Sequence, residues 1–204
     1  NSKEIISYDD HVNIYDGLPT DEKLQILNKK KKLSKKYNQL VKKYKQKITF
    51  KLLKKNIKYN KETFNLFLKL NKKYKIAIAT NAVRETLDIC IKILRIKRYC
   101  KFTISNEEVK NPKPHPDIYL EAIKKQDLDS NETIIIEDSA VGVRAGVSAG
   151  IKVIGLTAGK HWHQDRSDQE LLDAGALHVI NDYGKLKEKM NSLWAKDLLL
   201  RVTL

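Results

Sequence analysis

Cysteines and long apolar runs are scarce or absent in this 204-residue chain. It contains two cysteines, Cys90 and Cys100, which are too few for a disulfide framework. No run of about 18 apolar residues occurs, so neither a transmembrane helix nor a membrane partner is expected. No secretory signal peptide is recognisable, although a truncated start would hide one. A reducing, cytoplasmic setting is therefore the expectation.

Acidic residues are missing from one long stretch, although the chain as a whole has 25 of them. Between Lys23 and Lys61 there are 16 lysines and no Asp or Glu, so the net charge of +15 lies in this stretch. Such a stretch could steer anionic substrates or bind nucleic acid. It lacks the arginine clusters and aromatic platforms of dedicated nucleic-acid binders. We interpret it as a solvated helical face, and nucleic acid is not an expected partner.

Short apolar runs alternate with helical patterns through the second part of the chain, which predicts an α/β fold with a parallel sheet and right-handed crossovers. The first 57 residues contain helical spacing but no strand pattern. The predicted strands are 75–79, 101–104, 133–136, 152–156 and 178–180, and the predicted helices are 21–29, 34–45, 49–55, 61–72, 82–94, 116–125, 141–149, 169–174 and 184–193.

Two adjacent carboxylates end the most apolar of these strands. The run from Thr133 to Ile136 suits a strand buried on both faces of a parallel sheet, and Glu137 and Asp138 follow it directly. Open α/β sheets bind ligands just beyond the carboxyl ends of their strands. Mg²⁺ prefers oxygen ligands, and one or two carboxylates plus substrate phosphate and water are its usual set. These two residues therefore predict a metal site that handles phosphate.

Two further segments favour an anion at the same edge. Thr80 and Asn81 follow the strand 75–79, where a hydroxyl and backbone N–H groups at a helix start form an oxyanion site. Lys113 lies between Pro112 and Pro114, which exclude it from a helix interior and would hold its ammonium at a loop tip. A lysine ammonium is a compact cation that suits a phosphate.

Together these motifs resemble the haloacid-dehalogenase-like phosphohydrolases, in particular the group that contains β-phosphoglucomutase and phosphoglycolate phosphatase. The resemblance covers residues 76 to 183 and includes Gly142 and the Ala149-Gly150 pair. It implies a Rossmann-like core with a small α-helical cap domain, and Mg²⁺ as cofactor. By position it also implies roles for five residues: Thr80 and Asn81 hold the transferred phosphoryl group, Lys113 neutralises its charge and assists catalysis, and Asp138 with Glu137 holds the metal.

The motif that carries the family's nucleophile is absent from these residues. The resemblance implies an Asp-x-Asp motif at the end of the first core strand, and no strand here ends in one. Asp127-Leu128-Asp129 has the spelling but precedes a strand, so a turn is predicted. We expect residues 1–57 to be the cap and 58–204 the core, with the first core strand missing. The run 198–204 is strand-like and could fill that gap, but a frayed end is the favoured interpretation.

The residues before the first long helix resemble the cap's substrate-specificity loop. Gly17 and Thr20 are the candidate substrate-binding residues, with Thr20 or Asp21 capping the helix. Two histidines, His161 and His163, are interpreted as loop residues at the site mouth in preference to metal ligands. The expected function is a Mg²⁺-dependent phosphatase that acts on a small phosphorylated metabolite through an aspartyl-phosphate. A phosphomutase, or a relative that binds metal or phosphate without catalysis, is the alternative. The sequence leaves monomer and dimer equally open.

Overall fold

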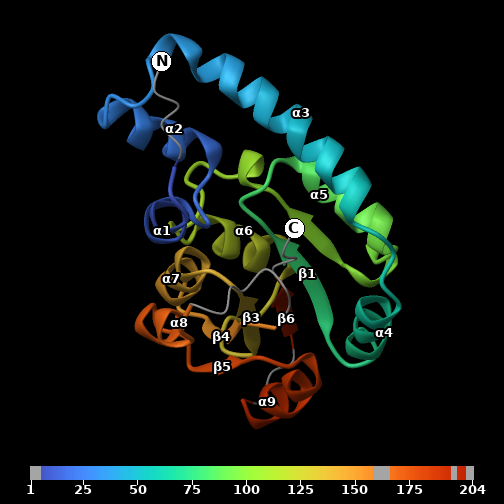
Figure 1. Cartoon of the computed structure of the whole chain (residues 1–204). Coiled ribbons are helices and arrows are strands. Elements are labelled where there is room, and N and C mark those ends of the chain that lie inside the picture. The colour runs from blue at the N-terminus through green and yellow to red at the C-terminus, as the bar shows by residue number, and fades with distance from the viewer. Residues whose placement is uncertain (1–5, 159–165, 194–196, 201–204) are drawn as a thin grey trace.

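The computed structural model describes residues 6–158, 166–193 and 197–200, and most of these build a six-stranded sheet with helices on both faces (Figure 1). Every strand pair is parallel, and the strand order is β2-β1-β6-β3-β4-β5. This confirms the predicted α/β class. The strands are β1 (Lys75–Ala79), β2 (Phe102–Ile104), β3 (Thr133–Glu137), β4 (Lys152–Leu156), β5 (His178–Ile180) and β6 (Asp197–Leu200).

Helices connect the strands at nearly the predicted positions. The largest difference is at the last of them, where the predicted helix 184–193 is a short 3₁₀ turn, η5 (Tyr183–Lys185), followed by α9. The Asp127-Leu128-Asp129 segment is a turn, as expected, because Asp127 ends α6 in the left-handed conformation at φ 48°. The helices are α4 (Lys61–Leu70), α5 (Arg84–Leu94), α6 (Asp117–Gln126), α7 (Ala140–Ser148), α8 (Gln169–Asp173) and α9 (Leu186–Ser192), with the 3₁₀ turns η3 (Lys97–Tyr99) and η4 (Asn106–Glu108).

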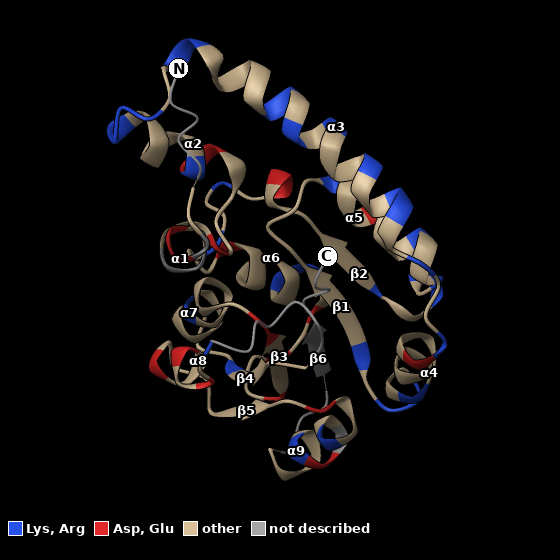
Figure 2. Ribbon diagram, viewed as in Figure 1, with Lys and Arg blue, Asp and Glu red and all other residues tan. Residues whose placement is uncertain are grey.

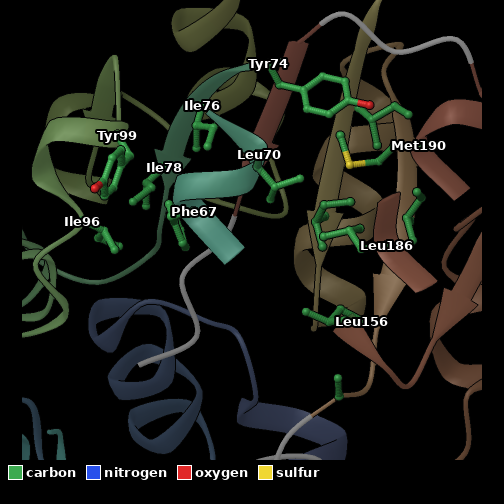
Figure 3. Close-up of a cluster of buried hydrophobic side chains, with 14 of the residues drawn as sticks. Phe67, Leu70, Tyr74, Ile76, Ile78, Ile96, Tyr99, Leu156, Leu186 and Met190 are labelled. Carbon is green, nitrogen blue, oxygen red and sulfur yellow. The ribbon is translucent and has the colours of Figure 1, made fainter. Parts of the chain in front are cut away.

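Alternate residues of the central strands feed two separate hydrophobic layers, because successive side chains of a strand point to opposite faces. Ile76 and Ile78 of β1 pack into the layer that α4, α5 and α9 cover (Figure 3). Ala77 and Ala79 of the same strand belong to the opposite layer, under α6, α7 and α8. Burial on both faces explains why the strands of this chain are near-continuous apolar runs.

Residues 8–56 form a helical segment beside the sheet, which we call the N-terminal helical segment (Figure 1). The two helices predicted at 34–45 and 49–55 are a single helix of 19 residues, and that prediction was wrong because nothing between them breaks a helix. Neither Thr20 nor Asp21 caps the helix after the loop, since Pro19 holds the N-cap position with no side-chain bond. The elements are α1 (Tyr8–Asp10), η1 (His11–Tyr15, a π-helix), α2 (Thr20–Lys29), η2 (Lys35–Tyr37) and α3 (Asn38–Asn56).

The lysine-rich stretch coincides with this segment. Blue ribbon segments, which mark Lys and Arg, recur along the length of α3 in Figure 2, whereas red and blue segments mix over the helices of the core. The N-terminal helical segment also contains α1 and η1, which the sequence did not predict. Asp9, Asp10 and His11 leave that short stretch without the regular apolar spacing of a helix. The sequence-based picture of lysines on a solvated helix therefore agrees with the structure.

The strand β6 lies at the centre of the sheet, between β1 and β3. Leu199 is in register with Ala77 of β1 on one side and with Ile135 of β3 on the other. The favoured interpretation of the C-terminal run as a frayed end was wrong for residues 197–200. Two flanking strands offer unpaired N–H and C=O groups that water cannot reach in the core, so an apolar run able to pair with both is strongly favoured there.

The two cysteines are free thiols and are poor nucleophiles. Cys90 is fully buried on the apolar face of α5, as expected, and Cys100 is half-buried. Burial raises the pKa of Cys90 to about 11 and that of Cys100 to about 12. Among the described residues, no helix is long and apolar enough to cross a membrane.

Candidate active site

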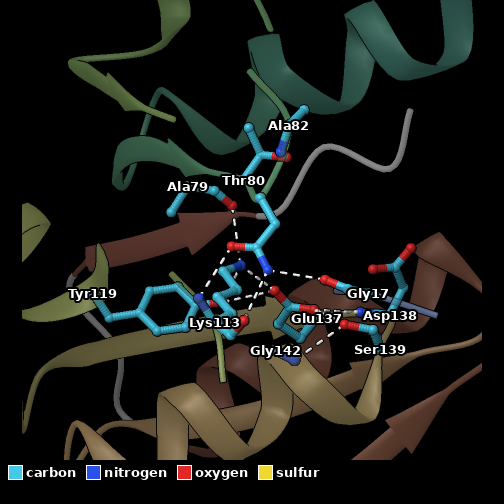
Figure 4. Close-up of polar contacts among 11 residues, drawn as sticks. Gly17, Ala79, Thr80, Ala82, Lys113, Tyr119, Glu137, Asp138, Ser139 and Gly142 are labelled. Atoms are coloured by element: carbon cyan, nitrogen blue, oxygen red, sulfur yellow. Dashed lines mark hydrogen bonds and ion pairs between the residues drawn. The ribbon is translucent and has the colours of Figure 1, made fainter. Parts of the chain in front are cut away.

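Three loops meet at the carboxyl edge of the sheet, where the sequence predicts a site (Figure 4). One follows β1 and contains Thr80 and Asn81, and another follows β3 and contains Asp138. The third precedes α6 and contains Lys113. Parallel strands bring these residues together because their carboxyl ends share one edge of the sheet. The structure thus gathers in one place residues that are up to 58 positions apart in sequence.

The ammonium of Lys113 points inward, away from the loop tip at which the sequence had placed it. Its Nζ donates to the hydroxyl of Tyr119 at 2.7 Å, to the carbonyl of Ala79 at 3.2 Å and to Oε1 of Glu137. The lysine is only 1% exposed. A buried ammonium is stable only with charge-assisted hydrogen bonds of this kind. The loop prolines therefore set the backbone, and Glu137 sets the direction of the side chain.

Glu137, predicted as a metal ligand, has both carboxylate oxygens engaged by protein groups. Oε1 accepts from Lys113 and, at 2.7 Å, from the hydroxyl of Tyr119. Oε2 accepts from the backbone N–H groups of Asp138 and Ser139 at 3.2 and 3.3 Å and from the Ser139 hydroxyl at 3.2 Å. These contacts place it as the counter-ion of Lys113 and as the acceptor that shapes the loop after β3.

Gly142 is required for that position of Glu137. A Cβ atom on Gly142 would lie 2.0 Å from Cδ of the Glu137 carboxylate, far inside van der Waals contact. Its backbone N–H donates to the hydroxyl of Ser139, the N-cap of α7. The glycine of the sequence motif is thus explained by the close approach of a carboxylate to the first turn of the helix.

We expect Gly142→Ala to lower the free energy of unfolding by about 3 kcal/mol, because overpacking a full site forces the carboxylate or the helix to move. Helix propensity alone would favour alanine by about 1 kcal/mol. Urea unfolding measures the difference, with Ser148→Ala on the exposed side of the same helix as control. A Gly142→Ala protein as stable as the control would contradict the close approach of Glu137 to this helix.

Asn81 joins the N-terminal helical segment to the site, a role that the sequence did not reveal. Its side-chain Nδ2 donates to the carbonyl of Gly17 at 2.9 Å and to that of Lys113 at 3.1 Å. Its Oδ1 accepts from the backbone N–H of Lys113 at 3.1 Å. Gly17 adopts φ +70°, and a Cβ there would lie 3.0 Å from Val141, so both conformation and space favour glycine. The amide of Asn81 therefore fixes two loops relative to β1.

Thr80 and Asp138 lie on either side of this network. Thr80 is 3% exposed, and its hydroxyl accepts from the backbone N–H of Ala82 at 3.1 Å. The helix α5 begins only at Arg84, so Ala82 and Val83 precede it instead of forming the predicted helix start. Asp138 is 6% exposed. Burial, and then the nearby carboxylate of Asp138, raises the pKa of Tyr183, which follows β5.

The oxygen chemistry of Asp138 fits one position in the coordination shell of a hard divalent cation. Mg²⁺ commonly takes one or two protein carboxylates and completes its shell with phosphate and water. Within the described part of the chain, no three His, Cys, Asp or Glu side chains gather into a self-sufficient metal cluster. A cation at this edge would therefore depend on oxygens from a phosphate ligand.

A cavity of about 1000 Å³ separates the N-terminal helical segment from this edge. Of the predicted site residues, Thr80, Asn81, Gly17 and Thr20 line it, whereas Lys113, Glu137 and Asp138 do not. Lys45 also lines it, and its Nζ donates to the Thr20 hydroxyl at 2.7 Å. Loss of solvent around that ammonium lowers the pKa of Lys45. Thr80 and Asn81 thus lie on the core side of the cavity, and Thr20 and Lys45 lie on the side of the N-terminal helical segment.

An ion pair holds the loop of Gly17 against the core. Arg166 donates to Asp16 at 3.0 Å and to Glu170 at 2.6 Å, and its side chain is 9% exposed. Burial by itself lowers the pKa of Arg166, but the bonds and charges of Glu170 and Asp16 outweigh it and raise the pKa. The histidines His161 and His163 lie outside the described residues.

Comparison with known proteins places these features in a wider group. The family model described as haloacid dehalogenase-like hydrolase matches residues 3–156. A phosphorylated carbohydrates phosphatase of Thermotoga maritima is 32% identical over 112 residues, which are 54% of this chain and 49% of that protein. Glycerol-1-phosphate phosphohydrolase 1 of Saccharomyces cerevisiae is 36% identical over 91 residues, which are 41% of this chain and 36% of that protein.

Solved structures share the fold over a larger part of the chain. A HAD hydrolase, family IA, variant 3, from Entamoeba histolytica superposes with a TM-score of 0.72 at 26% identity, over 92% of this chain and 83% of that one. The sequence matches to the two phosphohydrolases above, in contrast, span less than half of the length of either protein.

Proposed function

The chain belongs to the haloacid dehalogenase-like hydrolases, and from this premise we propose that the whole protein is a Mg²⁺-dependent phosphatase acting on a small phosphorylated metabolite. One observation carries the proposal beyond family membership. A fully buried lysine ammonium, a buried threonine hydroxyl and a buried aspartate converge on one edge of the sheet. Such a combination of a cation, a hydroxyl donor and a hard-metal ligand suits a dianionic phosphate. The phosphatase relatives support the same class of reaction.

Each residue has a separate task in this proposal. The hydroxyl of Thr80 and the backbone N–H of Asn81 hold two phosphate oxygens, and Lys113 neutralises the charge that builds up on the transferred group. Asp138 is the carboxylate that would hold Mg²⁺, while Glu137 keeps Lys113 charged and oriented. When bound, Mg²⁺ would act as a Lewis acid on the phosphate oxygens. This revises the expected pair of metal ligands to one.

The proposal also needs an attacking carboxylate, which these 204 residues do not supply. In the proposed mechanism an aspartate of an Asp-x-Asp motif, outside these 204 residues, attacks phosphorus and forms an aspartyl-phosphate, which water then hydrolyses. Residues 1–57 serve as the cap and 58–204 as the core. Gly17 and Thr20 would contact the organic part of the substrate from the cap side of the cavity.

Asp138→Asn is expected to weaken Mg²⁺-dependent phosphate binding at least tenfold, because a neutral amide is a poor ligand for a hard dication. Isothermal titration of inorganic phosphate in the presence and absence of Mg²⁺ measures this with the chain as it exists. Asp173→Asn, an exposed aspartate on α8, is the matched control. Equal phosphate affinity in all three proteins, whatever the Mg²⁺ concentration, would remove Asp138 from the metal site.

Phosphate release from a panel of phosphate monoesters tests the activity itself. The protein purified from its natural source is compared with the 204-residue chain, with and without Mg²⁺. Mg²⁺-dependent release by the natural protein supports the phosphatase. Phosphate binding without release by the natural protein would contradict it and would leave a binding role for the same site.

A further inference from the structure

The hydroxyl of Tyr119 lies between the two charged side chains of the buried ion pair. It accepts from the ammonium of Lys113 at 2.7 Å and donates to Oε1 of Glu137, also at 2.7 Å. The same Oε1 accepts directly from Lys113. The three side chains therefore form a closed ring of hydrogen bonds, with Tyr119 as its neutral member (Figure 4). The sequence patterns assign no role to this tyrosine.

The fold holds the Tyr119 hydroxyl at a fixed point. The residue lies in the first turn of α6, where its backbone N–H donates to the carbonyl of Pro116 at 2.9 Å. Its side chain is fully buried, in the layer that contains Ile118 and Ala122. A tyrosine has only two side-chain torsions, so burial of the ring leaves the hydroxyl oxygen little freedom to move. Glu137 ends β3, so the two anchors of the lysine come from different elements of the core.

Two anchors fix the direction of the Lys113 ammonium, and one anchor would not. A lysine ammonium is a point charge on a flexible stem, with three rotatable N–H donors. Bonded to Glu137 alone, the group could rotate about that bond. The second acceptor, Tyr119, removes this rotation, and an N–H group then donates to the carbonyl of Ala79 at 3.2 Å. Ala79 directly precedes Thr80, the proposed phosphate ligand, so this N–H is directed to the edge of the sheet where the phosphate would lie.

The bond to Ala79 is the contact that an incoming phosphate can replace. Among the contacts of the ammonium with Ala79, Tyr119 and Glu137 it is the longest. A hydrogen bond weakens with distance, and a dianionic phosphate attracts an ammonium more strongly than a neutral carbonyl does. Exchange of that one contact leaves the ring of Lys113, Tyr119 and Glu137 intact while the lysine meets its ligand.

We propose that Tyr119 is a positioning residue of the phosphate site, an inference that rests on the proposed function. Its hydroxyl holds the Lys113 ammonium so that one N–H is directed at a phosphate oxygen beside Thr80. Tyr119 acts through the lysine and does not itself contact the phosphate. The plainer role of a buried tyrosine is to pack and to satisfy its own hydroxyl. The two roles differ in a measurable way, because only the first makes phosphate binding by the folded protein depend on the hydroxyl.

The variant Tyr119→Phe tests this role, because it removes the hydroxyl and retains the ring. Isothermal titration of the chain with inorganic phosphate in the presence of Mg²⁺ measures the effect. Phosphate binding should weaken about fivefold to tenfold, which is the scale of one charge-assisted hydrogen bond that is no longer well directed. Urea unfolding of each variant establishes that the titration is made on folded protein.

The matched control is Tyr74→Phe, which removes another buried hydroxyl. Tyr74 belongs to the opposite hydrophobic layer and is 4% exposed, and its hydroxyl donates to Oδ1 of Asn191 at 3.1 Å. Loss of this hydroxyl should leave the phosphate affinity unchanged, whatever it does to the free energy of unfolding. The comparison therefore separates an effect on the site from the general effect of deleting a buried hydroxyl.

A third comparison shows whether Tyr119 acts through Lys113. The background is Lys113→Met with Glu137→Gln, which removes both charges of the ion pair together. Addition of Tyr119→Phe to this background should leave the remaining phosphate affinity unchanged, since the group that Tyr119 positions is absent.

The possible results distinguish this inference from the proposed function. Equal phosphate affinity of the wild type and Tyr119→Phe would overturn the inference and leave the proposed function intact. An equal loss of affinity with and without Lys113 would have the same meaning. Wild-type affinity in the Lys113→Met, Glu137→Gln background, or no phosphate binding by the unmodified chain, would instead contradict the proposed phosphate site, and the inference with it.

Discussion

Replacing Lys113 with methionine is expected to lower the free energy of unfolding by about 3–5 kcal/mol, the usual cost of removing one partner of a buried ion pair. The side chains of Lys113 and Glu137 are 1% and 0% exposed, so the variant leaves a carboxylate in the core without its cation. Methionine fills a similar volume, which keeps cavity formation out of the comparison. Urea unfolding at neutral pH, followed by circular dichroism, provides the measurement.

The paired variant Lys113→Met, Glu137→Gln separates charge from shape. Because it removes both charges, it should recover a large part of the stability that the single variant loses, and the double-mutant cycle yields the coupling energy between the two residues. The hydroxyl of Tyr119 remains as a hydrogen-bond donor to the new amide. If the free energy of unfolding of Lys113→Met lies within about 1 kcal/mol of the wild-type value, the ammonium and the carboxylate do not share a buried site.

The single and double variants of Lys113 should also distinguish its effect on stability from its effect on phosphate binding. The double variant is expected to regain stability but not phosphate affinity, since the cation that neutralises the phosphate is absent from both variants. Phosphate titration of the double variant, with the wild type as reference, checks this. Phosphate affinity equal to that of the wild type would exclude Lys113 from the phosphate site even if its structural role is confirmed.

Leu199→Pro is expected to abolish cooperative unfolding at 25 °C, or to lower its free energy by several kcal/mol. The strand β6 pairs with β1 and β3 along its length, and proline removes a backbone donor from a strand that is bonded on both sides. Domains of this size have total stabilities of only about 5–15 kcal/mol, so disruption of the central ladder is a large fraction of the whole. Thermal unfolding by calorimetry measures the effect.

Lys58→Pro is the matched control for that experiment. Lys58 lies in the extended linker after α3, and the preceding residue Ile57 already has φ −79° and ψ 125°, which a following proline favours. This variant should unfold as the wild type does. If Leu199→Pro is equally stable, residues 197–200 do not complete the sheet, and the pairing partners of β1 and β3 must be sought elsewhere.

The core strands could be predicted from the sequence because a single pattern, a short apolar run, identifies each of them. The strands 75–79 and 152–156 match the prediction to the residue, since burial on both faces leaves an apolar run with sharp polar ends. The sequence predicted two helices in place of the single helix α3 because the apolar residues of α3 lie on two different sides of it. Leu53 faces the protein while Tyr44 and Ile48 face solvent, so no single helical period fits them all.

Site residues could be placed at the sheet edge, but the directions of their side chains could not. The order of motifs located Thr80, Lys113 and Asp138 at one edge because parallel strands end there. The inward turn of Lys113 depends on Glu137 and Tyr119, which lie on other elements, and sequence spacing contains no information on that angle. The bond from Asn81 to Gly17 likewise joins two loops without periodic structure.

The position of β6 also determines when the sheet of these 204 residues can be completed during synthesis. Until residues 197–200 leave the ribosome, the strands described here form two pieces, β2-β1 and β3-β4-β5, each with one open inner edge. About 60 residues separate the end of β3 from β6, which at about 5–20 residues per second corresponds to about 3–12 s of elongation. Open strand edges pair readily with other chains. Within these 204 residues, the inner edges of β1 and β3 therefore stay open to pairing with other chains until the last described strand has been made.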